Sequence, residues 1–317
     1  MTTFKEIRGT AIQSVSTDPT NPEVGQIWYN NTIGVLKGYR SLGGAWASGG
    51  SLATARQYFP GAGTQTEAIA MGGTTTPGDS QTAATEEYNG TTWGPGGNMT
   101  SARFNSGGGG TQTASFVAGG NLGGTVTNIT EEYNGSTWGP GGNLNTTRQV
   151  LTGAGTQTAG LVFGGFPEGV NTNATEEYDG SSWTNGGNLG TARRGLAGAG
   201  TQTAGLGVGG FTTAFVVNTE EYDGSSWTAG GNLNTARSCA GAGIQTSALV
   251  FGGPAGATEA YNGTSWTTSP GTLGTPRSGL AGAGTQTLAL AFGGEPVTAA
   301  TEEYTDPTFA VQKITTS

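Results

Sequence analysis

Two residue types that often carry chemistry are almost missing from this chain. Histidine is absent from the 317 residues, and cysteine occurs once, as Cys239. The lack of histidine removes the commonest general base and the commonest metal ligand. One cysteine permits neither an intrachain disulfide nor a cysteine-based metal cluster, and we expect it to be buried and inert. The sequence therefore predicts a protein that is not an enzyme and that carries no metal ion or other cofactor.

Charge is also scarce, and most of it is negative. Only 10% of the residues are charged, and the formal net charge is −9 at pH 7. Because an acidic surface does not neutralise phosphates, neither nucleic acid nor an anionic membrane surface is expected as a partner. No apolar run approaches the roughly 18 residues of a spanning helix, and the first residues lack the apolar segment of a signal peptide. We therefore expect the chain to be made in the cytoplasm, without cleavage of a signal peptide and without insertion into a membrane.

Glycine, by contrast, is abundant, with 62 residues, and it marks a repeat. Each repeat runs from an arginine through Gly-Ala-Gly-Thr-Gln-Thr, an apolar run ending in Gly-Gly, a loop, Thr-Glu-Glu-Tyr and Trp. Successive repeats span 47, 45, 45, 44 and 40 residues. The loop after Gly-Gly accounts for this variation, and the rest of each repeat forms a constant frame of 36 residues. A rigid frame with one adjustable loop is typical of repeat proteins. The starting arginines are Arg56, Arg103, Arg148, Arg193, Arg237 and Arg277.

Four short strands are predicted in each repeat. The first covers the segment from the arginine to Gly-Ala-Gly, and the second is the apolar run, which is bounded by glycines and therefore suits a strand buried on both faces. The third is Thr-Glu-Glu-Tyr, and the fourth starts at the Trp. Asn-Gly or Asp-Gly lies between the last two, as at Asn89-Gly90, and is a strong hairpin signal. Four antiparallel strands in about 45 residues match one blade of a propeller.

The repeats resemble kelch repeats. The resemblance rests on six copies in which Gly-Gly ends an apolar strand and Tyr is followed, in five copies, by Trp five residues later. It covers about Trp46 to the C-terminus and implies an all-β fold, a six-bladed β-propeller of four-stranded antiparallel blades. We expect residues 45–317 to form this propeller. Residues 1–44 are expected to form an N-terminal attachment arm with a β-hairpin.

Two segments compete for the outer strand of the last blade. Trp46 lies 10 residues before the first repeat arginine, as Trp93 does before the second, which marks Ala45–Ser48 as a spare fourth strand. Phe309 stands where the last repeat would place its own Trp. We favour Trp46, because this strand would tie the two ends of the chain together and leave 309–317 as an edge strand or a tail. In the alternative, Phe309 closes its own blade and Trp46 belongs to the arm.

The arm contains an apolar segment with turn residues in its middle, Asn30 to Gly34, which predicts the β-hairpin. The hairpin resembles one found in structural proteins of tailed phages, and the repeats rich in Thr-Glu-Glu-Tyr-Asp-Gly-Ser-Ser-Trp resemble virion proteins of marine phages. A hairpin of this size is marginally stable alone. It is therefore expected to dock on the propeller, on another subunit of a homo-oligomer, or on a neighbouring virion protein. The candidate attachment residues are Ile27, Trp28, Tyr29, Leu36 and Tyr39.

Two polar positions recur in the repeats. Paired glutamates such as Glu86-Glu87 can act as acid and base. Their near-identical copies instead indicate a scaffold in which one glutamate pairs with the repeat arginine and the other faces water. The glutamine of Thr-Gln-Thr, such as Gln65, either rings one mouth of a central channel or, as we favour, satisfies backbone groups in its own turn.

The loops after Gly-Gly are the one asymmetric feature. In a four-strand meander they share a face with the connections between blades, and recognition often resides in such loops. Aromatic side chains there can stack on a sugar ring or anchor a protein, or they cover the edges of their own blades. The acidic loop residues are dispersed among different loops, so no calcium site is predicted. The loops span 74–84, 121–129, 166–174, 211–218, 254–257 and 295–300, and the candidate ligand-binding residues are Asp79, Asn121, Phe166, Glu168, Phe211, Phe215 and Glu295.

The resemblances lead us to predict a non-enzymatic structural protein of a phage virion. Its arm would attach it to other virion proteins, and its variable loops would bind a host-surface glycan or a neighbouring virion protein. A tail fibre or tail-tip adhesin is favoured over a capsid decoration protein. One alternative is an intracellular kelch-type scaffold with a soluble protein partner. Another is an enzyme of the galactose-oxidase or glycosidase type, which the lack of histidine disfavours.

Overall fold

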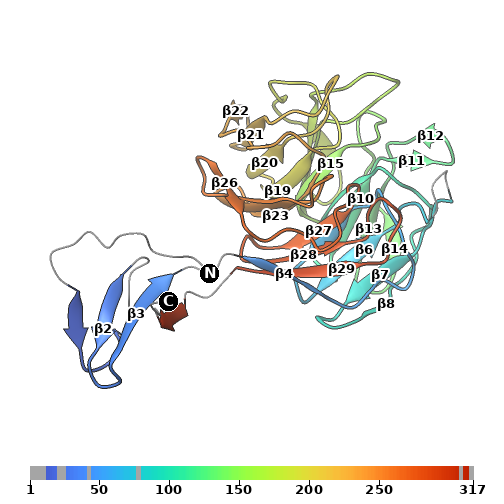
Figure 1. Ribbon diagram of the computed structural model, residues 1–317. Helices are drawn as coiled ribbons and strands as arrows, with labels where there is room; N and C mark the ends of the chain where they lie inside the picture. The colour runs from blue at the N-terminus through green and yellow to red at the C-terminus, as the bar shows by residue number, and fades with distance from the viewer. Residues whose placement is uncertain (1–11, 20–25, 41–43, 76–79, 307–309, 314–317) are drawn as a thin grey trace. The chain divides into compact units, whose positions relative to one another are not determined.

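A computed structural model describes residues 12–19, 26–40, 44–75, 80–306 and 310–313 (Figure 1). The described residues form strands, turns and loops, with no helix among them, which confirms the all-β class. They divide into two compact units. The larger unit is Gly44–Thr305, and the smaller unit combines the described residues of 1–43 with those of 306–317.

The larger unit contains six four-stranded antiparallel sheets among its described residues, which we number one to six in chain order. The first strands, which begin after the repeat arginines, are β5 (Gly61–Gly63), β9 (Gly107–Gly110), β15 (Thr152–Thr156), β19 (Ala197–Thr201), β23 (Ala240–Ile244) and β27 (Ala281–Gly284). The second strands are β6 (Ala68–Met71), β10 (Ser115–Ala118), β16 (Ala159–Phe163), β20 (Ala204–Val208), β24 (Ser247–Phe251) and β28 (Leu288–Phe292).

The third and fourth strands complete each sheet in the predicted order. The third strands are β7 (Thr85–Tyr88), β13 (Thr130–Tyr133), β17 (Thr175–Tyr178), β21 (Thr219–Tyr222), β25 (Thr258–Tyr261) and β29 (Thr301–Thr305). The fourth strands of sheets one to five are β8 (Trp93–Pro95), β14 (Trp138–Pro140), β18 (Trp183–Asn185), β22 (Trp227–Ala229) and β26 (Trp266–Ser269). The loop of sheet two also holds a short hairpin of β11 (Asn121–Leu122) and β12 (Thr125–Val126).

Burial and turn chemistry explain why these segments form strands. Leu161, Val162 and Phe163 in β16 have no exposed surface, as predicted for a strand covered on both faces. At the turn between β7 and β8, Gly90 has a φ of +85°, a conformation that glycine adopts without steric cost. Asn89 Oδ1 accepts the backbone N–H groups of the next turn residues and closes the hairpin.

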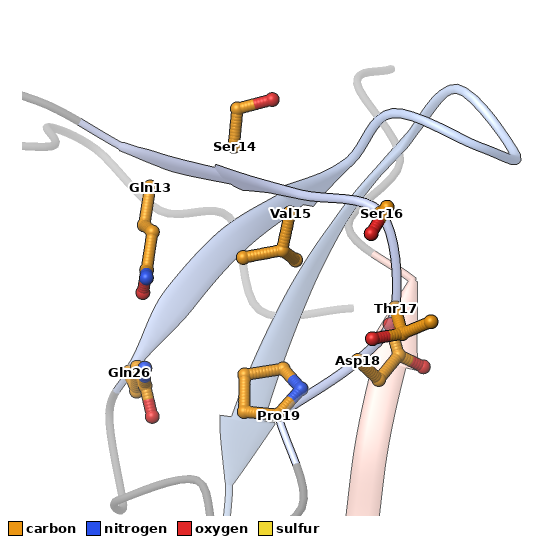
Figure 2. Close-up of a pocket in the computed structure, with 8 residues that line it drawn as sticks. All are labelled: Gln13, Ser14, Val15, Ser16, Thr17, Asp18, Pro19 and Gln26. Atoms are coloured by element: carbon orange, nitrogen blue, oxygen red, sulfur yellow. The ribbon is translucent and has the colours of Figure 1, made fainter.

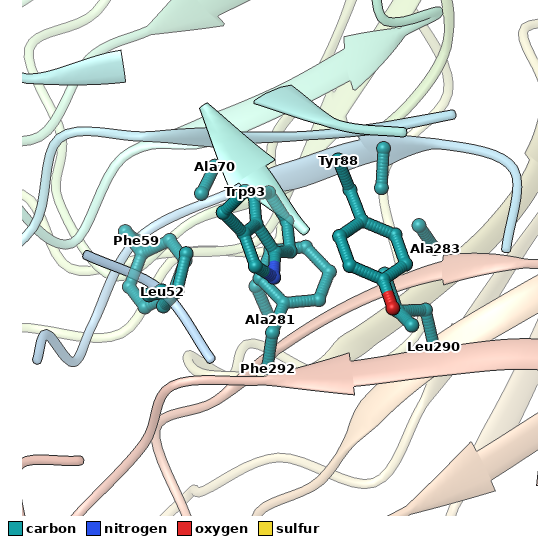
Figure 3. Packing of buried hydrophobic residues seen from close by; sticks show 10 residues of the cluster. Leu52, Phe59, Ala70, Tyr88, Trp93, Ala281, Ala283, Leu290 and Phe292 are labelled. Atoms are coloured by element: carbon teal, nitrogen blue, oxygen red, sulfur yellow. The ribbon is translucent and has the colours of Figure 1, made fainter. Parts of the chain in front are cut away.

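The first strands gather at the centre of the larger unit. Each lies beside the first strand of the next sheet, as β15, β19, β23 and β27 show in Figure 1. β27 of sheet six likewise lies beside β5 of sheet one. This approach requires glycine, because a Cβ on Gly153 would lie 2.4 Å from the backbone oxygen of Gly108 on the neighbouring strand. Further out, aromatic side chains interleave, and Phe59 and Trp93 pack on Phe292 of sheet six (Figure 3). The unit is therefore propeller-like, with four-stranded sheets packed around a common centre.

Sheet six takes its outer strand from the beginning of the unit. β4 (Ala45–Ser48) pairs antiparallel with β29 and places Trp46 opposite Tyr304. The Trp46 ring lies 5.1 Å from the ring of Tyr304 and 4.8 Å from that of Phe251 in sheet five. The prediction that Trp46 supplies this strand is confirmed, and Phe309 lies outside the described residues.

The smaller unit is one sheet, in the order β1 (Gln13–Val15), β2 (Ile27–Asn30), β3 (Val35–Arg40) and β30 (Ala310–Lys313). β2 and β3 form the predicted antiparallel hairpin, and Gly34 in the turn has a φ of +67°. β1 pairs parallel with β2, a neighbour that the sequence did not indicate. β30 pairs antiparallel with β3, so the larger unit ends at Thr305, whereas the sequence had suggested 317.

Two chain crossings join the units, and they start from paired residues. Thr305 pairs with Ala45 in the β29–β4 ladder, and Arg40 pairs with Ala310 in the β3–β30 ladder. Residues 41–44 separate the ladders on one crossing and 306–309 on the other, so the two crossings contain the same number of residues. The antiparallel pairing therefore has the same register in the β3–β30 ladder as in the β29–β4 ladder.

Candidate functional site

Each sheet of the larger unit holds a buried arginine–glutamate pair. In sheet three, Arg148 Nη2 lies 2.7 Å from Glu176 Oε1, and neither side chain is more than 1% exposed. Glu176 Oε2 accepts the backbone N–H of Asn145 as well. Burial lowers the pKa of Arg148, and the nearby Glu176 carboxylate opposes that shift. The other pairs are Arg56–Glu86, Arg103–Glu131, Arg193–Glu220, Arg237–Glu259 and Arg277–Glu302.

These pairs confirm that the first glutamate of each repeat serves the scaffold. The second glutamate was predicted to face water. It instead joins neighbouring sheets. Glu87 of sheet one accepts a hydrogen bond of 2.6 Å from the Tyr133 hydroxyl of sheet two. In sheet five Ala260 stands at this position, and the Tyr304 hydroxyl lies 2.9 Å from Ser269 Oγ. The other bonds are Tyr88–Glu303, Tyr178–Glu132, Tyr222–Glu177 and Tyr261–Glu221.

The repeat glutamines and tryptophans also join sheets. Gln112 Nε2 donates to the carbonyl oxygens of Ala68 and Tyr88 in the preceding sheet, and the other five repeat glutamines make equivalent bonds. The favoured interpretation, a role within their own turn, is therefore wrong. Trp138 donates its indole N–H to Thr85 of the preceding sheet at 3.0 Å, and the other repeat tryptophans do the same.

The variable loops share a face with the connections between sheets, as predicted. In five sheets, the residue after the repeat arginine forms a β-bridge with the residue after Gly-Gly. Four of the candidate binding residues occupy this equivalent place, and Asp79 lies outside the described residues. The bridges that hold those four are Phe104–Asn121, Gln149–Phe166, Arg194–Phe211 and Ser278–Glu295.

The loops of sheets three and four meet in what we call the arginine–phenylalanine cluster: Phe166, Asn171, Arg194, Phe211 and Phe215. Arg194 Cζ lies 4.3 Å from the ring centroid of Phe166 and 4.8 Å from that of Phe211. The cation is therefore held against two aromatic rings. Phe215 meets Phe211 edge to face at 5.3 Å and is 49% exposed. Phe166 reaches the next sheet through Arg194, so it does more than cover the edge of its own sheet.

Asn171 fixes the two loops of this cluster to each other. Its Nδ2 donates to the carbonyl oxygens of Phe211 and Thr212, at 3.2 and 2.9 Å. Its Oδ1 accepts a 3.0 Å hydrogen bond from Arg194 Nη1. Sequence reasoning missed both Asn171 and Arg194. A signal was present for Arg194, because the other repeats carry uncharged residues at its position, namely Gln57, Phe104, Gln149, Ser238 and Ser278.

Arg194 differs from the repeat arginines in its electrostatic surroundings. Each repeat arginine pairs with a glutamate, whereas Arg194 has no ion pair among the described residues. Within the same part of the chain, its hydrogen bond to Asn171 uses Nη1 only, and Nε and Nη2 have no protein acceptor. A guanidinium with unused donors and a fixed plane is suited to bind a planar anion.

The remaining candidate residues of this face lie outside the cluster. Asn121 is buried, and its Nδ2 donates to Gln149 Oε1 at 3.1 Å. Glu295 accepts a hydrogen bond from the Tyr58 hydroxyl, and burial together with this carboxylate raises the pKa of Tyr58. Glu168 has a φ of +43° in its loop. Asn121 and Glu295 are thus engaged in polar contacts of their own.

The centre of the larger unit offers little chemistry. The first strands line a cavity of about 120 Å³ with the glycines and alanines of 61–63, 108–110, 153–155, 198–200, 241–243 and 282–284. Across the described ranges, no three His, Cys, Asp or Glu side chains are grouped to hold a metal ion. Cys239 is buried, as predicted, and burial raises its pKa to about 11. The part of the chain that the structure describes contains no helix long and apolar enough to cross a membrane.

In the smaller unit, Asp18 organises the polar contacts around the hairpin. Its Oδ2 pairs with Lys37 Nζ at 2.5 Å, and its Oδ1 accepts hydrogen bonds from Asn30 Nδ2 and Trp28 Nε1. These contacts, the Lys37 bond first, lower the pKa of Asp18 to about 2. Trp28 is fully buried and is therefore a core residue of this unit.

The other attachment residues predicted for the arm differ in exposure. Tyr29 is 41% exposed, and Ile27 and Leu36 are half-buried. Tyr39 lies in β3, and its side chain is outside the described residues. Tyr29 is thus the predicted attachment residue that is shown to be accessible on this sheet.

An open hollow lies beside β1 of the smaller unit. Its volume is about 550 Å³. Gln13 and Val15 point to one side of β1, and Ser14 points to the other (Figure 2). The hollow is lined mainly by uncharged polar side chains and the backbone of one segment, residues 13–19, with Gln26 beside it.

Comparison with known proteins gives no assignment. No protein-family model matches the chain, and no curated protein matches it.

Proposed function

We propose that Gly44–Thr305 is a six-bladed β-propeller that acts as a rigid, non-enzymatic binding module. The same contacts recur between successive sheets and also between sheets six and one, where Gln65 and Trp93 donate to sheet six. This recurrence supports a ring. The constant turns on one face and the varied loops on the other support a binding role, because recognition often uses varied loops on a fixed scaffold.

The observation that carries the binding proposal is the arginine–phenylalanine cluster. The repeated arginines and first glutamates are used inside the sheets, so they add nothing to either face. The cluster breaks this repetition with an arginine that has no carboxylate partner in the described structure and with the half-exposed Phe215. It is therefore the part of the variable-loop face best suited to contact a ligand.

The biological setting that we propose is a phage virion. The smaller unit attaches the chain to other virion proteins, and the variable loops bind a host-surface glycan or a neighbouring virion protein. Support comes from the hairpin, which resembles one in structural proteins of tailed phages, and from the kelch-like repeats, which resemble virion proteins of marine phages. A tail fibre or tail-tip position is favoured over the capsid, because a recognition face is useful where the particle meets its host.

Locating the chain in purified particles tests the virion proposal. Mass spectrometry of particles purified by density should detect the chain, and antibodies against it should label tails in electron micrographs. Antibody absorbed with the purified chain is the control. Particles without the chain, together with recovery of the chain in complex with soluble intracellular proteins, would contradict the proposal and favour a scaffold.

Blocking one face at a time tests the binding role. Val170 in a variable loop is 66% exposed, and Ile244 in a constant turn is 55% exposed. Each can be changed to cysteine and coupled to a large maleimide polymer, because the native Cys239 is buried. Coupling at Val170→Cys should abolish adsorption of the purified chain to host cells, and coupling at Ile244→Cys should preserve it. The reverse pattern would place recognition on the constant face.

A further inference from the structure

We infer that the arginine–phenylalanine cluster binds a carboxylate-bearing sugar, with Arg194 contacting the carboxylate and Phe215 contacting the sugar ring. The inference rests on the proposed function, because it names the ligand class of the variable-loop face. It depends on the charge, the exposed ring and the size of this patch.

The charge of the patch selects an anion. Arg194 is the one arginine in the described part of the larger unit that has no carboxylate partner. Its Nε and Nη2 donors lie along one side of the guanidinium and have no acceptor in the described structure. Two parallel N–H groups of this kind match the two oxygens of a carboxylate.

The cluster holds this cation ready for a ligand. The rings of Phe166 and Phe211 lie against the guanidinium. Asn171 Oδ1 accepts a hydrogen bond from Nη1, on another edge of the guanidinium. Less side-chain freedom is then lost when an anion binds. The chain as a whole is acidic, with a net charge of −9, so long-range attraction does not favour anions. Over distances beyond about 10 Å that repulsion is screened by physiological salt, and the local contact decides binding.

The exposed ring and the small size of the patch favour a sugar over a protein. Among described residues of the variable loops, the large apolar side chains that are exposed are Val170 and Phe215. A stable protein interface buries about 800 Å² on each partner and has an apolar centre, which two side chains do not supply. Phe215 packs on Phe211, which lies against Arg194, and one half-exposed ring at this distance from an arginine is sufficient for a sugar ring that carries a carboxylate.

Binding of two matched sugars to the full-length chain tests the inference. Glucuronic acid and glucose, each displayed on the same polyacrylamide carrier, differ at the carboxylate and can be compared by biolayer interferometry. The wild-type chain should bind the glucuronic acid carrier at least about tenfold more tightly, the effect expected of one charged contact. The preference should decrease as salt is raised.

Variants separate this site from the rest of the surface. Arg194→Gln introduces the residue that two other sheets carry at this position, so the variant should fold and lose the preference for glucuronic acid. Phe215→Ala should weaken binding of both carriers. Ile244→Thr restores the repeat residue on the constant face and should leave binding unchanged, which makes it the matched control.

Several outcomes would overturn the inference. These are equal binding of the two carriers by the wild type, a preference that survives in Arg194→Gln, or equally tight binding of a polyglutamate carrier that has carboxylates but no sugar. If any of them occurs while purified particles contain the chain, the inference fails and the proposed function stands. If the sugar preference is found but particles lack the chain, the virion assignment fails and the site stands.

Discussion

The arginine that begins each repeat is a long charged side chain with almost no exposed surface. Burying such a charge is costly unless it is paired and hydrogen-bonded. Arg148 meets both conditions, because Nη2 pairs with Glu176 and Nη1 donates to the carbonyl oxygens of Gly164 and Ala174. The pair therefore fixes the end of the second strand to the start of the third. At this scale the repeat is held by polar contacts as well as by its apolar core.

Replacing Arg148 by alanine should lower the free energy of unfolding by about 3–5 kcal/mol, because Glu176 would remain buried without its counter-charge. Urea unfolding followed by tryptophan fluorescence measures the change. The double variant Arg148→Met, Glu176→Leu removes both charges and should recover most of the lost stability. A single variant as stable as the wild type would show that the pair is not needed to satisfy the buried carboxylate.

At the scale of the strand, β4 has an unusual position. It comes from the start of the larger unit, yet it is the outer strand of the last sheet. Trp46 holds it there through contacts with Phe251 and Tyr304 and through a 2.9 Å hydrogen bond from Nε1 to Thr258 Oγ1. β4 therefore links sheets five and six as the other fourth strands link their neighbours.

Trp46→Ala should destabilise the larger unit by about 3 kcal/mol, because it removes a large side chain that packs between two sheets. Trp46→Phe keeps a ring but loses the bond to Thr258, and should cost about 1 kcal/mol.

Deleting residues 1–48 would leave β29 as an unpaired edge, which should promote association. Chemical unfolding and size-exclusion chromatography measure these effects. A deletion variant that stays monomeric and equally stable would show that β4 is not needed to cover the edge of β29.

How far the sequence predicts the structure also depends on the element. The four strands of each repeat were predictable, because Gly-Gly, Thr-Glu-Glu-Tyr and Trp mark their ends in several copies. The pairing of β30 with β3 was not, because the two segments lie far apart in the chain and share no repeated motif. The contact of Arg194 with Phe166 was missed for a related reason. It depends on how two loops of different sequence fold over neighbouring sheets.

At the scale of the whole molecule, five tyrosine–glutamate bonds cross between sheets around the larger unit. Burial, and then the glutamate in each bond, raises the pKa of four of these tyrosines from about 10 to about 12. A raised pKa means that the folded state holds the proton more tightly than the unfolded state does. The protonated tyrosines therefore stabilise the association of the sheets. The four are Tyr88, Tyr178, Tyr222 and Tyr261.

The free energy of unfolding should decrease as the pH rises from about 10 to about 12. The contribution is complete below pH 10, where these tyrosines are protonated in both states, and it is lost as the pH passes the folded pKa of about 12. Urea unfolding at intervals from pH 8 to pH 12 measures this dependence. Tyr222→Phe should give a shallower decrease than the wild type. A variant with an unchanged slope would show that this bond does not couple to folding.

The equal crossings between the two units have a mechanical consequence. If the smaller unit is fixed and the larger unit is pulled, the load enters the β29–β4 ladder at one end, through the paired residues Thr305 and Ala45. The load is then divided between the outer strand β4 and the inner strand β29, and it pulls both strands in the same direction. With a single crossing at Ala45, the same load would peel the outer strand from its neighbour. Attachment through both crossings would therefore protect the outer strand of sheet six from being peeled away.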